Sequence, residues 1–352
     1  MIKGGEILVR EYECPSCGAT MVFDSTSQKM LCKHCGTQKT VQEMEELLEE
    51  NKQEVDYHTG EQASFRRYTC KGCGAEILTD DYTAATFCSF CGNPTLIEDR
   101  LSGEKTPAQI IPFKINKEQA QNMYQAWCKK GPLTPSDFTS KTTIEKITGM
   151  YVPFWLYDYT ANAKIGANCT RVSRERRGDM EYTHTDHYYV HRDVSDFYKK
   201  IPVDASEKMP DDVMDKLEPF SYGEIKDFDM GYLSGFMAER YNFTSDEMKK
   251  RAEKRVKEYI LRETKNTIQG YSTTVITEQN VRLNCKEASY AMLPVWLLNY
   301  RYKGKDYLFT LNGQTGKIVG TLPISKGKMA VWFGGVTAVV YLLLTLVGGI
   351  LG

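Results

Sequence analysis

The sequence lacks the short motifs that mark the common catalytic classes. Its 352 residues contain no glycine-rich phosphate loop, GxSxG nucleophile elbow, HExxH helix or dinucleotide-binding glycine pattern. The nearest approach to a phosphate loop begins at Gly103, but Glu98 stands five residues earlier, where such a loop needs glycine. We therefore expect the protein not to be an enzyme. A hydrolase in the body of the chain is an open alternative for which we can name no nucleophile.

Basic residues are scarce at the beginning of the chain. Residues 1–100 contain 10 Lys/Arg and 17 Asp/Glu, a balance of −7 in a chain whose net charge is −1. Proteins that bind nucleic acid neutralise its phosphates with lysine and arginine. The one local basic cluster in this part is Arg66, Arg67 and Lys71. Nucleic acid is therefore an unlikely partner, and a nucleic-acid-binding protein is the alternative function.

Residues 1–10 contain no long apolar run, so we expect no secretory signal. The opposite end is different, because residues 329–351 are 23 residues without a charge. As a helix they span about 34 Å, against a hydrocarbon core of about 30 Å. Lys326 and Lys328 precede them, and positive flanks stay on the cytoplasmic side. The pattern predicts a single-pass protein of the cytoplasmic membrane, with its body in the cytoplasm and the lipid bilayer as one partner.

Eight of the 11 cysteines form two units of equal spacing. In each unit two CxxC pairs are separated by fourteen residues, and the second unit repeats the first at an offset of 56. Four thiolates on two tight turns can close a tetrahedron around zinc, with bonds of about 2.3 Å. The spacing predicts two zinc ions per chain. The predicted ligands are Cys14, Cys17, Cys32 and Cys35 in the first unit and Cys70, Cys73, Cys88 and Cys91 in the second.

A glycine follows the second cysteine of every pair. A metal-binding knuckle curls the backbone so that its amides face the sulfurs, and glycine reaches positive φ without a clash at Cβ. Because protein would fill all four positions, each site would be closed and structural, with no open position for a catalytic water. A disulfide framework is the alternative, and it would require an oxidising compartment.

These signals predict a multidomain protein with two small zinc ribbons, an α+β body made of two related halves, and one C-terminal transmembrane helix. The predicted divisions are zinc ribbon 1 at 10–40, an acidic helical spacer at 41–63, zinc ribbon 2 at 64–98, the body at 107–325 and the transmembrane helix at 329–351. Residues 93–106 have the proline and glycine of a linker. The helix of the spacer, residues 40–51, has an apolar stripe that either packs on a ribbon or docks a partner.

The body contains a faint internal repeat. Residues 152–159 read VPFWLYDY and match LPVWLLNY at 293–300, an offset of 141. The repeat predicts halves at 107–200 and 201–325, with a helical insertion at 221–270; chance similarity of short apolar strings is the alternative. Predicted helices cover 117–130, 207–217 and 244–268, and residues 312–316 predict a hairpin turn.

Two other features of the sequence are candidates for a metal site and for a lipid contact. His184, His187 and His191 cannot converge on a metal from one strand, because alternate side chains point to opposite faces. The basic run at 249–257 is either the solvated face of an amphipathic helix or a contact for anionic lipid headgroups.

Several segments together resemble a bacterial family of membrane-anchored double zinc-ribbon proteins, often labelled as TFIIB-type or primosomal-helicase-like zinc ribbon proteins. The resemblance rests on the two cysteine units, IPFKI at 111, GMYVPFWLYD at 149, the YLSGF stretch with its following residues at 232–241, and LPVW at 293. It implies a non-enzymatic scaffold at the cytoplasmic membrane, similar to members found beside membrane-stress proteins. We expect an adapter that recruits a cytoplasmic or membrane protein partner; neither the partner nor the oligomeric state follows from the sequence.

Overall fold

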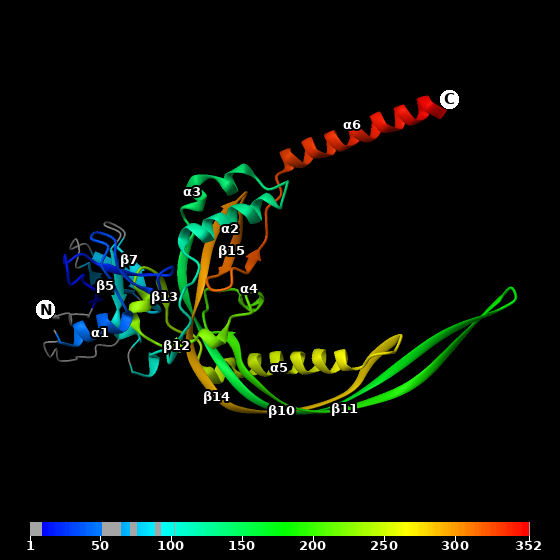
Figure 1. Ribbon diagram of the computed structural model, residues 1–352, viewed down its shortest axis with the longest axis horizontal. Coiled ribbons are helices and arrows are strands. Elements are labelled where there is room, and N and C mark those ends of the chain that lie inside the picture. Colours follow the sequence, from blue (N-terminus) through cyan, green and yellow to red (C-terminus); the bar gives the residue numbers. More distant parts are fainter. Residues whose placement is uncertain (1–8, 51–64, 71–75, 89–92, 102, 352) are drawn as a thin grey trace.

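The computed structural model describes residues 9–50, 65–70, 76–88, 93–101 and 103–351. It is a multidomain α+β structure that is elongated. The described N-terminal segments lie at one end of the long axis, whereas a C-terminal helix and a long β-hairpin extend toward the other (Figure 1). The helices are α1 (Val41–Glu50), α2 (Lys117–Lys129), α3 (Lys141–Ile144), α4 (Asp211–Lys216), α5 (Ser245–Thr267) and α6 (Lys326–Leu351).

One eleven-stranded sheet runs through most of the described chain, in the order β1-β8-β7-β13-β10-β14-β15-β16, with β11 beside β10 and β9 joining β14 to β12. Its strands are β1 (Val9–Arg10), β7 (Thr83–Phe87), β8 (Pro94–Ile97), β9 (Gln109–Ile110), β10 (Thr148–Arg177), β11 (Met180–Asp204), β12 (Lys226–Asp227), β13 (Met237–Glu239), β14 (Thr273–Tyr302), β15 (Lys305–Asn312) and β16 (Ile318–Gly320). There are two further small sheets. The first contains β2 (Met21–Asp24), β3 (Lys29–Cys32) and β4 (Gln38–Lys39), and the second contains β5 (Phe65–Thr69) and β6 (Glu76–Asp80).

The two similar segments of the predicted repeat are direct neighbours in this sheet. They belong to β10 and β14, which pair antiparallel with Trp155 opposite Tyr290 and Gly149 opposite Trp296. Both indole N–H groups donate to main-chain carbonyls, Trp155 to Phe243 at 2.8 Å and Trp296 to Ile115 at 2.9 Å. The two predicted halves therefore share one sheet, and their relation by duplication stays a prediction.

Phe113, in the IPFKI segment, sits at the centre of the main core. Its ring stacks on Phe236 at 4.2 Å and meets Tyr151 and Trp296 edge-on at 5.0 and 5.1 Å. The side chain is fully buried. This cluster joins the segment after β9, the segment before β13 and the central pair of strands, so it holds distant parts of the chain together.

Replacing Phe113 with alanine should therefore lower the free energy of unfolding by about 3–5 kcal/mol, because a large cavity would be left among rings that cannot all collapse into it. Chemical denaturation monitored by circular dichroism measures this loss. Phe197, whose ring is 42% exposed on β11, is the matched control, and its alanine variant should change stability by less than about 1 kcal/mol. Equal effects of the two substitutions would contradict this packing.

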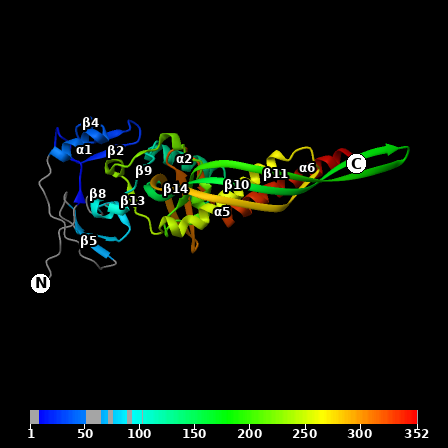
Figure 2. The ribbon, with the colours of Figure 1, turned by 90° about the horizontal axis from the view of Figure 1, so that it is seen from below.

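Beyond the core, β10, β11 and β14 continue as a curved three-stranded arm, and β10 and β11 extend further as a hairpin (Figures 1 and 2). Alternate residues of β10 from Tyr157 to Ile165 are buried on one face, which α5 covers with Ala252, Val256 and Ile260. The three strands β10, β11 and β14 are 30, 25 and 30 residues long, and no pattern in the sequence predicted such lengths.

The predicted helix at 244–268 is confirmed as α5, with a capping box in which Thr244 and Glu247 exchange side-chain to backbone hydrogen bonds. The interpretation of its basic run needs a correction. Lys249, Lys250, Lys254 and Lys257 are exposed. Arg251 and Arg255 instead turn into the body, where acidic residues from the end of β11 and from α4 receive them. Arg251 pairs with Asp204, Asp211 and Asp215, and Arg255 pairs with Asp215 and Glu218.

Arg255 and Lys254 provide adjacent basic positions in opposite environments. Arg255 is buried and also donates to Tyr259 at 2.8 Å, whereas Lys254 has a side chain 79% exposed. Arg255→Met should lower the free energy of unfolding by about 1–3 kcal/mol, because it removes charged hydrogen bonds to the half-buried carboxylates of Asp215 and Glu218. Lys254→Met should cost less than about 1 kcal/mol. Thermal melts of the two variants measure this difference. An effect of Arg255→Met as small as that of Lys254→Met would mean that the Arg255 side chain is solvated.

Three further predictions need revision at their boundaries. The helix predicted at 207–217 is shorter, as α4. The linker predicted at 93–106 contains β8, which pairs with β7 and β1, so it is part of the sheet. The predicted helical insertion at 221–270 also contributes β12 and β13. In contrast, the hairpin turn at 312–316 is confirmed. The N–H of Asn312 donates a hydrogen bond to the carbonyl of Lys317, and β15 pairs antiparallel with β16.

Among the described helices, α6 is long and apolar enough to cross a membrane, over Lys326–Thr345. None of that stretch is buried against the rest of the protein. The N-terminal end of α6 contacts the body, and the helix then extends away from it (Figure 1).

Candidate metal centre

The first cysteine unit brings four sulfurs together. All four Sγ atoms lie within 4.8 Å of one another, with Cys14 and Cys35 at 3.5 Å and Cys17 and Cys32 at 3.5 Å. Zinc–sulfur bonds of about 2.3 Å in a tetrahedron place sulfurs about 3.8 Å apart. The cluster therefore has the size that a tetrahedral metal ion requires. Cys14 and Cys32 are buried, and Cys17 and Cys35 are exposed.

Each knuckle of this unit is shaped by its own backbone. The N–H of Gly18 donates to the carbonyl of Cys14 at 2.8 Å, and that of Gly36 donates to Cys32 at 2.9 Å. Gly18 and Gly36 have φ of +71° and +79° with no atom near an added Cβ. The glycines are therefore required by backbone conformation rather than by lack of space.

A second set of hydrogen bonds in the unit lowers the pKa of two of its thiols. Burial opposes ionisation of Cys14, but hydrogen bonds from the backbone at Ser16 and Cys17 and from Cys35 and Thr37 outweigh it and lower the pKa of Cys14 to about 6. The hydroxyl and N–H of Thr37 likewise lower the pKa of Cys35. Metal ligands must be deprotonated, so these bonds favour a cation at Cys14 and Cys35. At Cys17, in contrast, the hydrogen bond from the backbone of Ala19 is outweighed by hydrogen bonds with the other three cysteines of the unit and by burial, which raise the pKa of Cys17 to about 12.

The described residues on either side of the four CxxC pairs are paired in the same register. In each case the residue before the first cysteine pairs, antiparallel, with the residue six positions after that cysteine. The pairs are Glu13–Thr20, Leu31–Gln38, Thr69–Glu76 and Phe87–Pro94. The second cysteine unit therefore has hairpins of the same register as the first.

Only part of the second unit can be described. Cys73 and Cys91 lie outside the described residues, as does Lys71. Cys70 and Cys88 are buried in a small cluster with Tyr68 and Ile97. The N–H of Cys88 donates to the carbonyl five residues later, at Asn93, as Cys14 donates to Ala19 and Cys32 to Thr37. The described half of the unit thus repeats the backbone of a metal-binding knuckle.

The first unit is fastened to the body by the YLSGF segment. Phe23 N–H donates to Ser234 O at 2.9 Å, and Ser234 Oγ donates back to Met21 O at 2.9 Å. The ring of Phe23 meets Tyr232 at 5.1 Å. On the neighbouring helix α1, Val41 packs so closely on the body that a Cβ on Gly231 would come within 2.6 Å of it. The apolar stripe of α1 is therefore covered by the protein itself.

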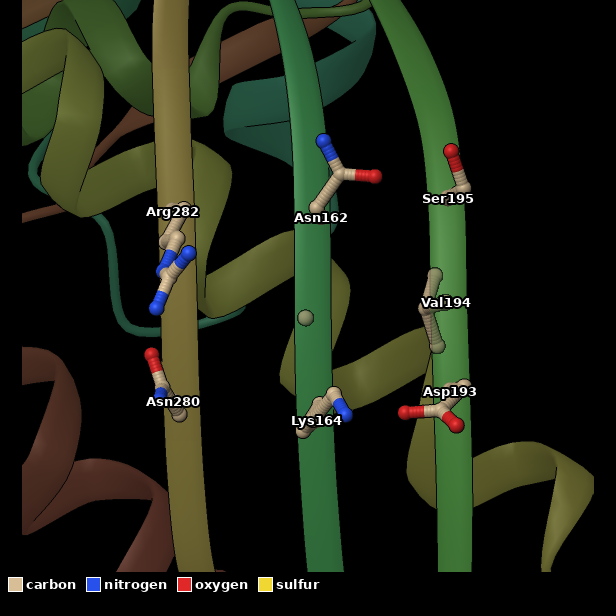
Figure 3. Close-up of a pocket in the computed structure, with 8 residues that line it drawn as sticks. Asn162, Lys164, Asp193, Val194, Ser195, Asn280 and Arg282 are labelled. Atoms are coloured by element: carbon tan, nitrogen blue, oxygen red, sulfur yellow. The ribbon is translucent and has the colours of Figure 1, made fainter.

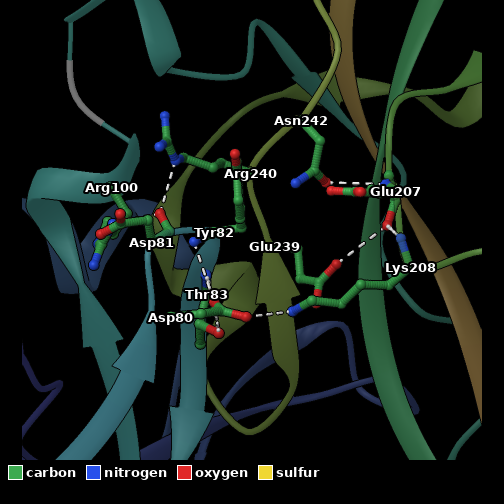
Figure 4. A network of polar contacts seen from close by, with 11 residues as sticks. Asp80, Asp81, Tyr82, Thr83, Arg100, Glu207, Lys208, Glu239, Arg240 and Asn242 are labelled. Carbon is green, nitrogen blue, oxygen red and sulfur yellow. Dashed lines mark hydrogen bonds and ion pairs between the residues drawn. The ribbon is translucent and has the colours of Figure 1, made fainter. Parts of the chain in front are cut away.

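The second unit is joined to the body by strand pairing and charge. β7 pairs with β13, so the sheet continues across the predicted boundary between ribbon 2 and the body. Around this joint, Lys208 bonds Asp80 and Glu239 at 2.6 Å each (Figure 4). Arg100 pairs with Asp81 at 2.9 Å, and Arg240 donates to the carbonyl of Asp81 at 2.9 Å (Figure 4). Both units are thus attached through one segment, residues 231–240.

Asp229 lies at the joint between the first unit and the body. Burial, together with the charge of Glu45, outweighs the hydrogen bond from Gly231 and raises the pKa of Asp229 to about 7. An acid whose pKa is higher in the folded state binds its proton more tightly there. Its contribution to stability is fully present below the unfolded pKa of about 4 and is lost as pH rises through about 7.

We therefore expect the melting temperature of the wild-type protein to fall between pH 5 and pH 8 (roughly the range in which Asp229 releases its proton). Asp229→Asn cannot lose a proton yet keeps an oxygen for Gly231, so its melting temperature should depend less on pH. Differential scanning fluorimetry across this range compares the two. Parallel curves would mean that Asp229 is ionised throughout.

The histidines lie on the arm. His184, His187 and His191 are exposed on β11, and His191 Nε2 is 3.3 Å from Asp193 Oδ1. Elsewhere on the arm, an open cavity of about 450 Å³ lies on the sheet face away from α5. Lys164 and Asp193 face each other across two strands there, with Asn280 and Arg282 on the third (Figure 3). This open surface of mixed charge does not define a reaction.

Comparison with known proteins gives one informative match. No family model and no solved structure matches the sequence. The uncharacterized protein YdjG of Bacillus subtilis (strain 168) is 42% identical over 345 residues, which cover 98% of this chain and 99% of that protein. The similarity therefore extends over the cysteine units, the sheet and the C-terminal helix together.

Proposed function

This chain belongs to the family of the uncharacterized protein YdjG, and on that premise we propose that it is a non-enzymatic, zinc-binding adapter anchored in the cytoplasmic membrane. In this proposal the N-terminal end recruits a cytoplasmic protein partner, and α6 holds the complex at the bilayer. The resemblance to membrane-anchored double zinc-ribbon proteins supports the same assignment, including a role in the response to membrane stress.

The observation that carries the proposal is the converging four-cysteine cluster at the end of the molecule opposite α6 (Figure 1). Tetrahedral sites with four sulfur ligands are typical of zinc and of iron–sulfur centres. We propose zinc for this cluster and a second zinc at Cys70, Cys73, Cys88 and Cys91. The second ion is supported by equal spacing, by the shared hairpin register and by the repeated bond at Cys88. The proposal thus gives the chain two complete zinc ribbons. It also retains a body of two related halves.

Closed sites of this kind stabilise a surface and perform no chemistry themselves. The cysteine units are held rigidly, through hydrogen bonds, ring contacts and a shared sheet, so they can present a defined surface to a partner. That surface is acidic over residues 1–100, which favours a protein partner over nucleic acid.

A test uses full-length tagged protein extracted from native membranes. A Cys17→Ser/Cys35→Ser variant should enter membranes at the wild-type level but lose the co-purifying protein, because its first ribbon cannot hold a metal. Cys285→Ser, which lies far from both units on β14, is the matched control and should retain the partner. Recovery of the same proteins with all three chains would overturn recruitment through the ribbons.

Nucleic-acid binding is the second candidate, supported by Arg66 and Arg67 on β5. Binding through phosphates weakens by about 10³ to 10⁵ between 50 and 200 mM salt when six to ten contacts are made. The full-length protein should therefore show no binding to duplex DNA or to RNA at about 150 mM salt. Micromolar binding that is lost in Arg66→Glu/Arg67→Glu would favour this candidate instead.

A further inference from the structure

The beginning of α6 is fixed to one corner of the body. The N–H of Ser325 donates to the carbonyl of Leu133 at 2.8 Å, and the Lys328 ammonium donates to the carbonyl of Thr134 at 2.6 Å. Gly131 lies so close to Leu322 that an added Cβ would come within 2.8 Å of it. The residues just before the apolar stretch are therefore attached to the turn that follows α2.

Two other segments meet at the same corner. Phe138, a few residues after that turn, packs against Tyr300 at 4.4 Å and Tyr307 at 5.9 Å, which brings in the hairpin between β14 and β15. Gln121 of α2 donates to the carbonyl of Ile144 at 3.2 Å, which brings in α3. The end of α2, α3, the β14–β15 turn and the beginning of α6 thus form one surface (Figure 1).

This surface is strongly basic. Segments 129–147, 301–306 and 322–328 contain nine basic and three acidic residues, a balance of +6 in a chain whose net charge is −1. All nine basic residues are exposed. They are Lys129, Lys130, Lys141, Lys146, Arg301, Lys303, Lys305, Lys326 and Lys328. The acidic residues nearest to them make only long, exposed ion pairs, Lys141–Glu145 at 4.0 Å and Arg301–Asp306 at 3.8 Å, which neutralise little of this charge.

We propose that this surface, which we call the membrane collar, rests on the headgroups of anionic phospholipids around the beginning of α6. The inference depends on the proposed transmembrane anchor. Lipid is the favoured occupant because α6 would place the collar directly at the bilayer surface, where basic residues are attracted to anionic headgroups. Ile324, 60% exposed beside Lys326, adds an apolar contact at the same depth.

The collar gives the anchor an orientation. A single helix alone leaves the body free to tilt, whereas a charged surface fixed beside it selects one face toward the membrane. The acidic N-terminal segments lie at the far end of the molecule (Figure 1) and would be held away from anionic lipid, where a cytoplasmic partner can reach them.

The test reconstitutes the full-length protein into lipid nanodiscs of phosphatidylcholine alone or with phosphatidylglycerol. A negatively charged amine-acetylating reagent then labels the lysines, and mass spectrometry gives the rate at each site. Lys129, Lys130, Lys303 and Lys305 should react at least about threefold more slowly in the anionic discs, because the negative surface repels the reagent and stabilises the ammonium form. High salt should remove the difference.

The exposed lysines of α5 provide a matched control. Lys249, Lys250, Lys254 and Lys257 lie on the arm and should react equally in both discs. A variant with K129E, K130E, K303E and K305E should lose the protection of Lys141 and Lys146, whereas K249E, K250E, K254E and K257E should retain it. Circular dichroism confirms that each variant is folded.

The outcomes separate the two proposals. Entry of the protein into both discs with equal labelling rates at the collar would overturn the membrane collar and leave the anchor intact. Failure to enter either disc would overturn the anchor and the collar with it. Protection that appears in phosphatidylcholine discs only after acidic proteins are added would identify a protein as the occupant and would also overturn the lipid proposal.

Discussion

Serine in place of Cys17 and Cys35 is expected to lower the zinc content of the purified chain from two ions to one. The two side chains are exposed, so the substitutions remove ligands without disturbing the packing of Cys14 and Cys32. In zinc-finger peptides a structural zinc contributes about 10–16 kcal/mol of binding free energy, which is folding free energy for so small a unit. Residues 10–40 should therefore unfold.

Hydrogen exchange measures how far this unfolding reaches. Amides of β2 and β3 should exchange rapidly, and Phe23, which donates to Ser234, should lose its protection. Tyr232 should follow, because its ring packs on Phe23. The paired strands β10 and β14 should keep theirs. Unchanged zinc content, or unchanged exchange in β2 and β3, would contradict a metal site at this unit.

Deleting residues 330–352 should move the protein from the membrane fraction to the soluble fraction when the extract contains high salt. The deleted residues contain most of the apolar helix, whereas Lys326 and Lys328 remain. The rest of the fold should survive, since residues 326–345 make almost no buried contact with the body. The measurement is fractionation of cell extracts, followed by circular dichroism of the released protein.

The salt dependence of this result separates two contributions. Release at low salt would mean that α6 provides all of the attachment. Attachment that persists at low salt and is lost at high salt is expected if the membrane collar binds anionic lipid, because added salt screens exposed charges. Retention of the shortened protein after high-salt and carbonate washes would contradict a single anchor.

Local signals in the sequence were sufficient for several elements. The beginning of α5 follows from a threonine with glutamate three residues later, a capping box that needs only neighbouring residues. The first four-cysteine cluster follows from CxxC spacing, because two tight turns on paired strands leave the sulfurs little choice of position. The coarse α+β organisation and the apolar C-terminal helix also follow from patterns along the chain.

Long-range contacts decided what the sequence could not predict. Arg251 and Arg255 carry the same charge as the exposed lysines beside them, and the carboxylates of Asp204, Asp215 and Glu218 draw them inward. Similarly, the sequence around Lys208 does not indicate that its side chain donates a hydrogen bond to Asp80, 128 residues earlier. The linker predicted after Cys91 failed as a boundary because β8 pairs with β1, far away in sequence.

The cavity on the arm and the membrane collar are also built by segments that are far apart in the sequence, so neither could be predicted from it. The collar residues come from three segments that are up to about 200 residues apart, and each segment has only a modest charge by itself. Their sum becomes visible only when Phe138 packs on β14 and β15 and when Ser325 bonds the turn after α2.

The central claim is that two closed sulfur sites hold zinc at the end of the molecule that faces the cytoplasm. X-ray absorption at the zinc edge, on full-length protein purified from membranes under reducing conditions, tests it most directly. We expect two zinc ions per chain, each with four sulfur neighbours at about 2.3 Å and no nitrogen or oxygen ligand. One ion or none per chain, a mixed ligand shell, or disulfides among the eight cysteines would contradict it.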